Sequence, residues 1–252
     1  MAKSLLYAIN GGVDELKGTK VVPGIEPITD EVLDFDKVMA NYKKVLSYVA
    51  GLYVDAVNII HFMHDKYAYE ASQMALHDTH VERLMAFGMA GLSVAADSLS
   101  AIKFAKVKPI RNHAGIAVDF TVKGDFPKYG NDDDYADDIM VSVFNEYKDY
   151  ITGRPTTRGG VYHVDMLPTT CHVYFGDVMI ATPNGRLAHN PLSEGISPEK
   201  GADINGPTAV VKSCSKMNHC ETGGTLLNQK FTPDVVAGEE GLNNMASLIR
   251  SY

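Results

Sequence analysis

The sequence predicts an α/β fold in which helices alternate with strands that pair in parallel. Long segments carry apolar residues at three- and four-residue spacing, which is typical of helices with one buried face. Shorter segments alternate apolar with polar or small residues, which is typical of half-buried strands. The loops between them are short and contain turn residues, and no internal repeat or low-complexity tract occurs. We therefore treat residues 1–252 as a single unit.

The composition is that of a globular protein and excludes several classes of function. Hydrophobic residues make up 45% of the 252 residues and charged residues 21%. The net charge of −8 argues against nucleic-acid binding, which needs clustered Lys and Arg. No uninterrupted apolar run is long enough to span a bilayer, and no signal peptide is recognisable, so we expect no membrane association. Three cysteines are too few for a disulfide framework, which indicates a reducing cytoplasm.

The first long helix is expected over residues 35–63, where apolar side chains recur at helical spacing. Asp34 or Asp36 can cap its start, where a carboxylate also suits the helix dipole. The apolar face of this helix broadens toward its C-terminal end. We therefore expect that end to be buried on most sides.

The remaining elements follow from capping residues, periodicity and turn signals. Pro207 suits the first turn of a helix, and the acidic run at 131–134 suits the start of another. The expected helices cover about residues 69–76, 80–87, 97–106, 135–151, 206–217 and 242–252. The expected strands cover residues 89–96, 115–123, 169–175 and 225–231, with a turn at 183–186.

Side chains that bind metals are numerous but poorly arranged for a metal site. His61 and His64 are three residues apart, as are His77 and His80, yet no usual zinc signature completes either pair. The acidic run 131–138 lacks the central glycine and the final glutamate of a calcium loop. We expect no metal, and we interpret the acidic run as stabilising a helix N-terminus.

The three cysteines are expected to be inert thiols. Cys214 and Cys220 form neither a zinc knuckle nor a redox CxxC motif. Cys171 and His172 are adjacent, so on the expected strand they would point to opposite faces. A complete non-radical enzyme that uses one of these histidines or cysteines stays open as an alternative.

Longer strings in the first half closely resemble pyruvate formate-lyase, a glycyl radical enzyme. They are LYAINGGVDE at 6–15, NIIHFMHDKY at 58–67, GLSVAADSLSAIK at 91–103 and AKVKPIR at 105–111. From about residue 127 the chain instead resembles the dehydratase and choline lyase branch of the same family. Those strings are KYGNDDDYAD at 128–137, PTTCHVYFG at 168–176, PNGR at 183–186, LSEGISP at 192–198, GPTAV at 206–210 and GGTLLNQKF at 223–231. The resemblance therefore covers the whole chain, about 1–126 and 127–252, with a change of branch between them.

The resemblance implies part of a ten-stranded α/β barrel that encloses radical chemistry. In such enzymes a partner activating enzyme, which uses S-adenosylmethionine and an iron–sulfur cluster, installs a backbone glycyl radical. That radical oxidises a cysteine, whose thiyl radical starts carbon–carbon cleavage of pyruvate with formate C-acetyltransferase activity, diol dehydration or release of trimethylamine from choline. No bound cofactor is expected.

The same resemblance places this chain between the two radical-bearing loops. The family's cysteine loop lies just before the string that begins at Ala2, and its glycyl loop lies beyond residues 242–252. We therefore expect a single incomplete barrel segment, inactive alone, with no catalytic residue. The substrate-pocket candidates are Met166, Pro168, Thr169 and Thr170. Expected partners are another copy of the chain, the missing enzyme segments and the activating enzyme. A non-catalytic binding or scaffold protein derived from the barrel is the alternative.

Overall fold

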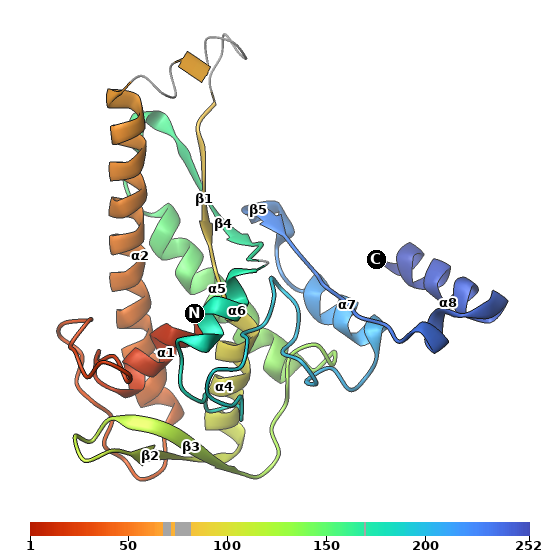
Figure 1. Ribbon diagram of the computed structural model, residues 1–252, viewed down its shortest axis with the longest axis horizontal. Coiled ribbons are helices and arrows are strands. Elements are labelled where there is room, and N and C mark those ends of the chain that lie inside the picture. Colours follow the sequence, from red (N-terminus) through yellow and green to blue (C-terminus); the bar gives the residue numbers. More distant parts are fainter. Residues whose placement is uncertain (68–71, 74–81, 169) are drawn as a thin grey trace.

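The computed structural model describes residues 1–67, 72–73, 82–168 and 170–252, which fold into an α/β body with two projecting parts (Figure 1). The helices are α1 (Ala2–Ile9), α2 (Phe35–Lys66), α4 (Leu92–Phe104), α5 (Asp134–Thr152), α6 (Cys171–Asp177), α7 (Pro207–Ser215) and α8 (Gly238–Ser251). The strands are β1 (Leu84–Gly88), β2 (Lys106–Arg111), β3 (Ala117–Lys123), β4 (Val161–Met166) and β5 (Thr222–Thr225).

Two sheets organise the described strands. The first has the order β1-β4-β5, and both of its pairings are parallel, as the sequence predicts. Phe87 lies opposite Val164, and Met166 lies opposite Thr225. The second sheet is the antiparallel pair β2-β3, which closes the base of the body (Figure 1). The ten strands of a complete barrel are not seen in the described part of this chain.

Helix α4 is the centre of the core. Every residue from Leu92 to Ile102 is buried, so this helix has no solvent-facing side along those residues. The core cluster around it joins the first half of α2, helix α5, strands β1 and β4, and helix α7. A second, smaller cluster connects α1 and α4 to residues 179–192. Because α4 has neighbours on all sides, its sequence lacks the period that marks a helix with one apolar face.

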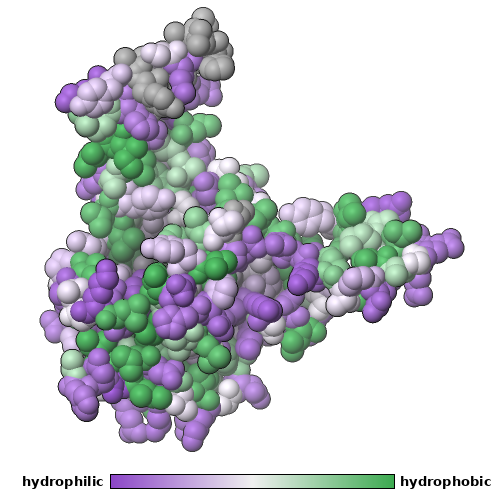
Figure 2. Space-filling view, viewed as in Figure 1, coloured by the Kyte–Doolittle hydropathy of each residue, from purple (hydrophilic) through white to green (hydrophobic). Residues whose placement is uncertain are grey.

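Helix α2 confirms the expected helix and its cap. The expectation that its C-terminal end is buried on most sides is wrong. The Asp34 carboxylate accepts a hydrogen bond from the Lys37 backbone N–H at 2.9 Å. Buried residues on this helix end at Val54, and large apolar side chains beyond it, such as Ile59 and Phe62, are exposed. The upright part of the surface accordingly shows hydrophobic side chains (Figure 2). The described part of this chain contains one helix, α2, that is long and apolar enough to cross a membrane, a criterion that core helices of soluble proteins also meet.

Polar contacts hold this upper half of α2 to the strands beside it. Asn58 accepts a hydrogen bond from the Tyr162 hydroxyl at 2.7 Å. The Asp65 carboxylate, whose side chain is only 4% exposed, lies 3.4 Å from the Arg83 guanidinium and 2.8 Å from that of Arg158. Buried side chains on α2 end at Val54, so these polar contacts carry more of the attachment of the helix beyond that residue.

Several expected elements are confirmed. Helices at 135–151, 206–217 and 242–252 correspond to α5, α7 and α8, the strand at 115–123 corresponds to β3, and 183–186 forms a turn. The Asp133 side chain caps α5 by accepting from the Tyr135 N–H at 2.9 Å, which agrees with the interpretation of the acidic run.

Other expectations are wrong. Residues 84–88 form a strand where a helix was expected, 92–104 form one helix where a strand followed by a helix was expected, and 171–177 form a helix where a strand was expected. The strand expected at 225–231 ends at Thr225, and β2 and β4 are not among the expected elements. The helix expected at 69–76 falls largely outside the described residues. For α4 the reason is that a short apolar run fits a buried helix as well as a strand.

Candidate functional site

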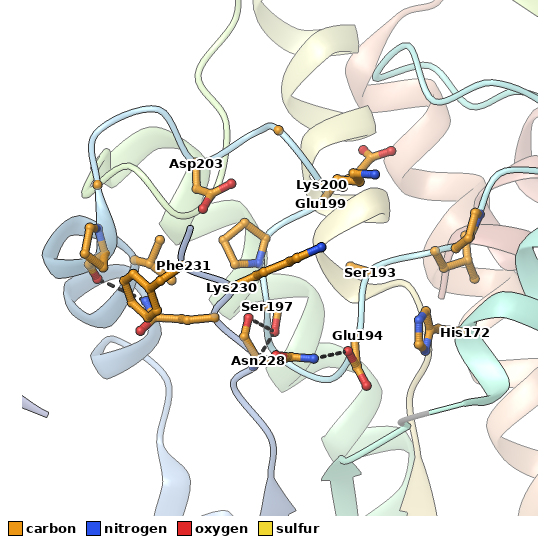
Figure 3. Close-up of a pocket in the computed structure, with 18 of the residues that line it drawn as sticks. His172, Ser193, Glu194, Ser197, Glu199, Lys200, Asp203, Asn228, Lys230 and Phe231 are labelled. Atoms are coloured by element: carbon orange, nitrogen blue, oxygen red, sulfur yellow. Dashed lines mark hydrogen bonds between the residues drawn. The ribbon is translucent and has the colours of Figure 1, made fainter. Parts of the chain in front are cut away.

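A cavity of about 1020 Å³ lies where β4 and β5 end (Figure 3). Its walls come from α6, which follows β4, from residues 190–201, and from residues 228–232, which follow β5. Ligands of α/β proteins commonly bind in the space outside the carboxyl ends of parallel strands. The polar side chains in its lining are His172, Asn190, Ser193, Glu194, Ser197, Glu199, Lys200, Asp203, Asn228, Gln229, Lys230 and Thr232. The cavity is therefore the best candidate site in the described part of the chain.

A glycine brings the cavity wall close to the strand ends. Gly195 has a φ of +56°, and a Cβ atom there would lie 2.2 Å from the Leu226 carbonyl oxygen and 2.9 Å from that of Met166. Only glycine fits so close to backbone at positive φ. The Gly195 N–H donates to the Pro168 carbonyl at 3.2 Å, and the Leu226 N–H donates to the Met166 carbonyl at 2.9 Å. Residues 193–197 are thereby fixed to the segments after both strands.

Two polar atoms in this wall have no hydrogen-bond partner among the described residues. The Ser193 hydroxyl belongs to a residue that is only 4% exposed, and the His172 Nδ1 atom is also buried. Beside them the Asn228 amide donates to the Glu194 carboxylate at 2.6 Å, and the Ser197 hydroxyl accepts from the Asn228 N–H at 2.8 Å. Buried polar groups are normally paired. The Glu194 and Asn228 side chains in this wall can offer hydrogen bonds to a small hydroxylated molecule.

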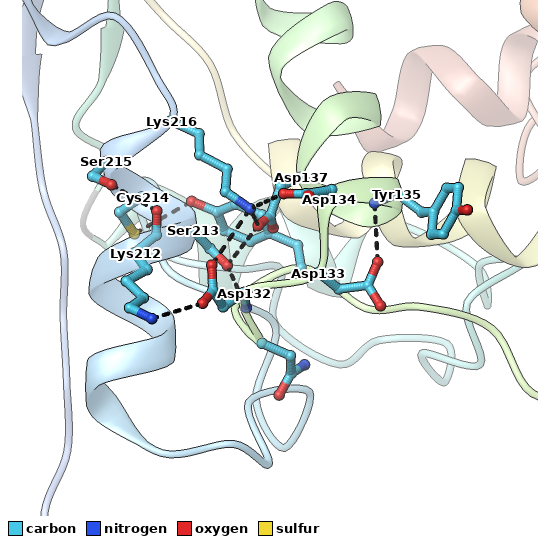
Figure 4. A network of polar contacts seen from close by, with 12 residues as sticks. Asp132, Asp133, Asp134, Tyr135, Asp137, Lys212, Ser213, Cys214, Ser215 and Lys216 are labelled. Carbon is cyan, nitrogen blue, oxygen red and sulfur yellow. Dashed lines mark hydrogen bonds and ion pairs between the residues drawn. The ribbon is translucent and has the colours of Figure 1, made fainter.

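A network of charges fixes the α7 side of the cavity to α5 (Figure 4). The Lys216 ammonium lies 2.7 Å from both the Asp134 and the Asp137 carboxylates. Asp137 is fully buried and also accepts a hydrogen bond from the Ser213 hydroxyl at 2.9 Å. Burial raises the pKa of Asp137, whereas its bonds to Lys216 and Ser213 oppose that rise. The acidic run thus pairs with α7 as well as capping α5.

The thiols differ in accessibility. Cys214 is buried and accepts a hydrogen bond from the Tyr129 hydroxyl at 3.3 Å, while Cys171 and Cys220 are exposed. Burial raises the pKa of the Cys214 thiol to about 11, so its reactive thiolate is scarce at neutral pH. Cys171 begins a helix, so the argument that placed it and His172 on opposite faces of a strand was wrong. Within the described ranges, no three His, Cys, Asp or Glu side chains gather so as to hold a metal ion.

Comparison with known proteins identifies the family. The Pyruvate formate lyase-like family model matches residues 1–176, and the Glycine radical family model matches residues 192–252. The chain belongs to the glycyl radical enzyme family. A curated relative, trans-4-hydroxy-L-proline dehydratase of Clostridioides difficile, is 58% identical over 175 residues. That match covers 64% of this chain and 22% of the relative.

Solved structures of glycyl radical enzymes resemble the whole chain. Hydroxyproline dehydratase from Clostridioides difficile, solved with trans-4-hydroxy-L-proline bound, superposes with a TM-score of 0.81 at 39% identity over 100% of this chain. The B12-independent glycerol dehydratase of Clostridium butyricum gives a TM-score of 0.81 at 30% identity. A glycyl radical enzyme from Archaeoglobus fulgidus gives 0.82 at 25% identity. This chain spans 35% of the length of each of these structures.

Of the four substrate-pocket candidates, Met166 and Pro168 lie behind the cavity wall. Met166 is buried and Pro168 half-buried, and their carbonyls hold the wall in place. Thr170 is exposed at the start of α6, and Thr169 lies outside the described residues. Direct contact of these residues with substrate stays a prediction.

Sequence reasoning did not identify Ser193, Glu194 and Asn228 as candidates. Their signal was present, because all three lie in strings that carry the family resemblance at 192–198 and 223–231. Those strings were used to recognise the family, and no spacing rule indicated that they meet in space.

Proposed function

We propose that this chain forms one wall of the substrate chamber of a glycyl radical dehydratase that acts on trans-4-hydroxy-L-proline or a similar small hydroxylated molecule. The observation that carries the proposal is the 58% identity over 175 residues to trans-4-hydroxy-L-proline dehydratase. The cavity after β4 and β5, with the Glu194–Asn228 pair in its lining, supplies groups suited to a hydroxylated substrate. On this proposal, residues 1–252 are one incomplete segment of the ten-stranded barrel.

The chemistry that the family supplies is a glycyl radical and a cysteine thiyl radical, installed by an activating enzyme in the cytoplasm. On this proposal the chain's own residues bind and orient the substrate and exclude water from it. The chain alone is inactive, because none of its three thiols matches the family's catalytic position. Cys214 is further held by Tyr129 and has a raised pKa, which makes it a poor nucleophile.

A segment exchange tests this proposal. The matching segment of the Clostridioides difficile dehydratase is replaced by this chain, and the matching segment of the glycerol dehydratase serves as the control insert. After anaerobic activation, the glycyl radical is measured by electron paramagnetic resonance and dehydration is measured with trans-4-hydroxy-L-proline and with glycerol. We expect the chimera to carry the radical and to dehydrate trans-4-hydroxy-L-proline. A chimera that carries the radical but dehydrates neither compound, or only glycerol, would contradict the proposal.

Inactivity of the isolated chain is tested separately. The chain is incubated with the activating enzyme, S-adenosylmethionine and a reductant, and the full-length relative serves as the positive control. We expect a radical signal from the relative and none from this chain. A doublet that is assigned to this chain by isotope labelling of its glycines would refute the expected inactivity.

The alternative function is a non-catalytic binding protein derived from the barrel. It is favoured by the fact that residues of this chain alone line the large cavity. Saturable binding of trans-4-hydroxy-L-proline by the isolated chain, together with an inactive chimera, would support that alternative.

A further inference from the structure

A second pocket, of about 200 Å³, lies against α4 on the other side of the turn at residues 199–201. It shares Asn190, Glu199, Lys200 and Gly201 with the large cavity, so this turn separates the two spaces. Its other lining residues are Asp97, Lys128, Asn184, Gly185, Arg186, Leu187 and Ala202. Neither the family resemblance nor the proposed function accounts for this pocket.

Two residues of opposite charge that line it each have a buried polar atom without a partner among the described residues. Asp97 is 1% exposed, and while one carboxylate oxygen accepts from the Tyr129 N–H at 2.8 Å, the other accepts nothing. Arg186 is 4% exposed; its Nη1 donates to the carbonyls of Leu187 and Asn190 and its Nη2 to that of Ile180, while Nε has no partner among the described residues. A buried acceptor and a buried donor thus remain to be satisfied in two residues that line one pocket.

The charges around the pocket are mixed. Glu199 interacts electrostatically with both Arg186 and Lys128, and its carboxylate also accepts from the Asn184 amide. Asp97 interacts with Glu199 and with Lys128. A lone cation would therefore meet Lys128 and Arg186, and a lone anion would meet Asp97 and Glu199. A molecule that carries both charges meets a complementary group at each end.

We propose that this pocket binds a small zwitterion, such as an amino acid or a betaine. Its ammonium group lies between Asp97 and Glu199, and its carboxylate lies between Lys128 and the Nε–H of Arg186. The volume is below the ~300–1,000 Å³ of pockets for drug-sized ligands, which limits the occupant to a molecule of a few heavy atoms. This site is distinct from the large cavity and goes beyond the proposed function.

The Asp97 carboxyl gives the binding a pH dependence. Burial raises its pKa to about 8, the nearby Glu199 and Asp137 carboxylates act in the same direction, and Lys128 and the Tyr129 N–H act against it. Glu199 also has a pKa raised by its burial. An ammonium ion favours ionised Asp97, so binding at pH 6 releases a proton and the affinity rises between pH 6 and pH 8.

Calorimetry of the whole chain tests the proposal, with L-proline and glycine as zwitterions and methylammonium and acetate as half-ligands. We expect saturable binding of the zwitterions and at least tenfold weaker binding of either half-ligand. Asp97→Asn keeps the bond to the Tyr129 N–H and should weaken zwitterion binding at least tenfold. Lys128→Met should weaken it similarly, and Lys44→Met, at an exposed lysine on α2, should leave it unchanged.

Each result of these measurements either supports or overturns the proposal. Circular dichroism checks the fold of each variant, and if Asp97→Asn does not fold, Lys128→Met and the half-ligands carry the test. Absence of zwitterion binding at every pH, or binding that neither variant weakens, overturns the proposal and indicates that the pocket holds only water. Dehydratase activity of the chimera is measured without reference to this pocket, so either proposal can fail alone.

Discussion

Removing the Lys216 ammonium is expected to expose how strongly the α5–α7 junction depends on one cation. Lys216 is the nearest cation to the buried Asp137 carboxylate, at 2.7 Å, and it also lies 2.7 Å from Asp134. In Lys216→Met the apolar part of the side chain remains and only the charge is lost. One oxygen of Asp137 already lacks a partner among the described residues, so the variant leaves a buried and poorly satisfied carboxylate.

The expected cost follows from the burial of the two partners. Breaking a fully buried pair by removing one partner costs about 3–5 kcal/mol, and exposed pairs contribute about 0–1 kcal/mol. Asp137 is fully buried, whereas the Lys216 side chain is 26% exposed, so an intermediate value applies. We expect Lys216→Met to lower the free energy of unfolding by about 2–3 kcal/mol at pH 7.

Urea denaturation measures this loss, with tyrosine circular dichroism as the signal because the chain has 13 tyrosines and no tryptophan. The matched control is Lys212→Met on the same helix, where the lysine side chain is 63% exposed and lies 3.0 Å from Asp132. The control should cost less than about 1 kcal/mol. Equal losses in the two variants would refute the argument, because they would show that burial of Asp137 does not matter.

The effect of Lys216→Met depends on pH with a definite sign. The folded pKa of Asp137 is raised above its unfolded value, so folding favours the protonated acid. This unfavourable contribution of Asp137 is absent below the unfolded pKa of about 3.9 and grows as pH rises through the folded pKa. Loss of the Lys216 cation raises that folded pKa further. The difference between variant and parent is therefore expected to be largest near neutral pH and to shrink toward pH 4.

Three further predictions concern the backbone, the core and the thiols. Gly195→Ala should lower the free energy of unfolding by about 3 kcal/mol or more, because its Cβ atom would meet two backbone carbonyls. Gly185→Ala, at positive φ in open space, should lower it by about 1–2 kcal/mol. Equal losses in urea denaturation would contradict the close approach of backbone at Gly195. Leu99→Ala in the buried helix α4 should cost about 3 kcal/mol, and a loss below about 1 kcal/mol would contradict its burial. In a thiol titration at pH 7, Cys171 and Cys220 should react at once, and Cys214 should react only after denaturation. Fast reaction of all three thiols would contradict the burial and raised pKa of Cys214.

The helices that the sequence predicts well share one property. In α2, α5 and α7, apolar residues recur on one face and a capping residue such as Asp34, Asp133 or Pro207 stands at the start. Helix α4 has neither signal, since the residues from Leu92 to Ile102 are buried on every side. Its apolar start at 89–96 therefore matched a buried strand equally well.

Strand β4 illustrates a signal that was present and missed. Tyr162, Val164 and Met166 are buried, and the residues between them are more exposed, which is the period-2 pattern of a strand. Helix α6 illustrates the opposite case, because Val173, Tyr174 and Phe175 have strand propensity yet lie exposed on a helix. The family resemblance located the site only approximately, since the contact of residues 193–197 with two strand ends depends on tertiary structure.

The stability of the two halves of α2 is expected to depend differently on temperature and salt. Below Val54 the helix is held by apolar packing, which weakens on cooling, and above it the main contacts run through Asn58 and the charged Asp65. Added salt screens partly exposed ion pairs and strengthens apolar burial when the salt is sulfate. Because the first half also carries an ion pair, Lys43 with Glu146 at 2.9 Å, added salt is expected to weaken contacts in both halves, whereas cooling weakens mainly the first. Cold is therefore expected to loosen the first half of this continuous helix before the second.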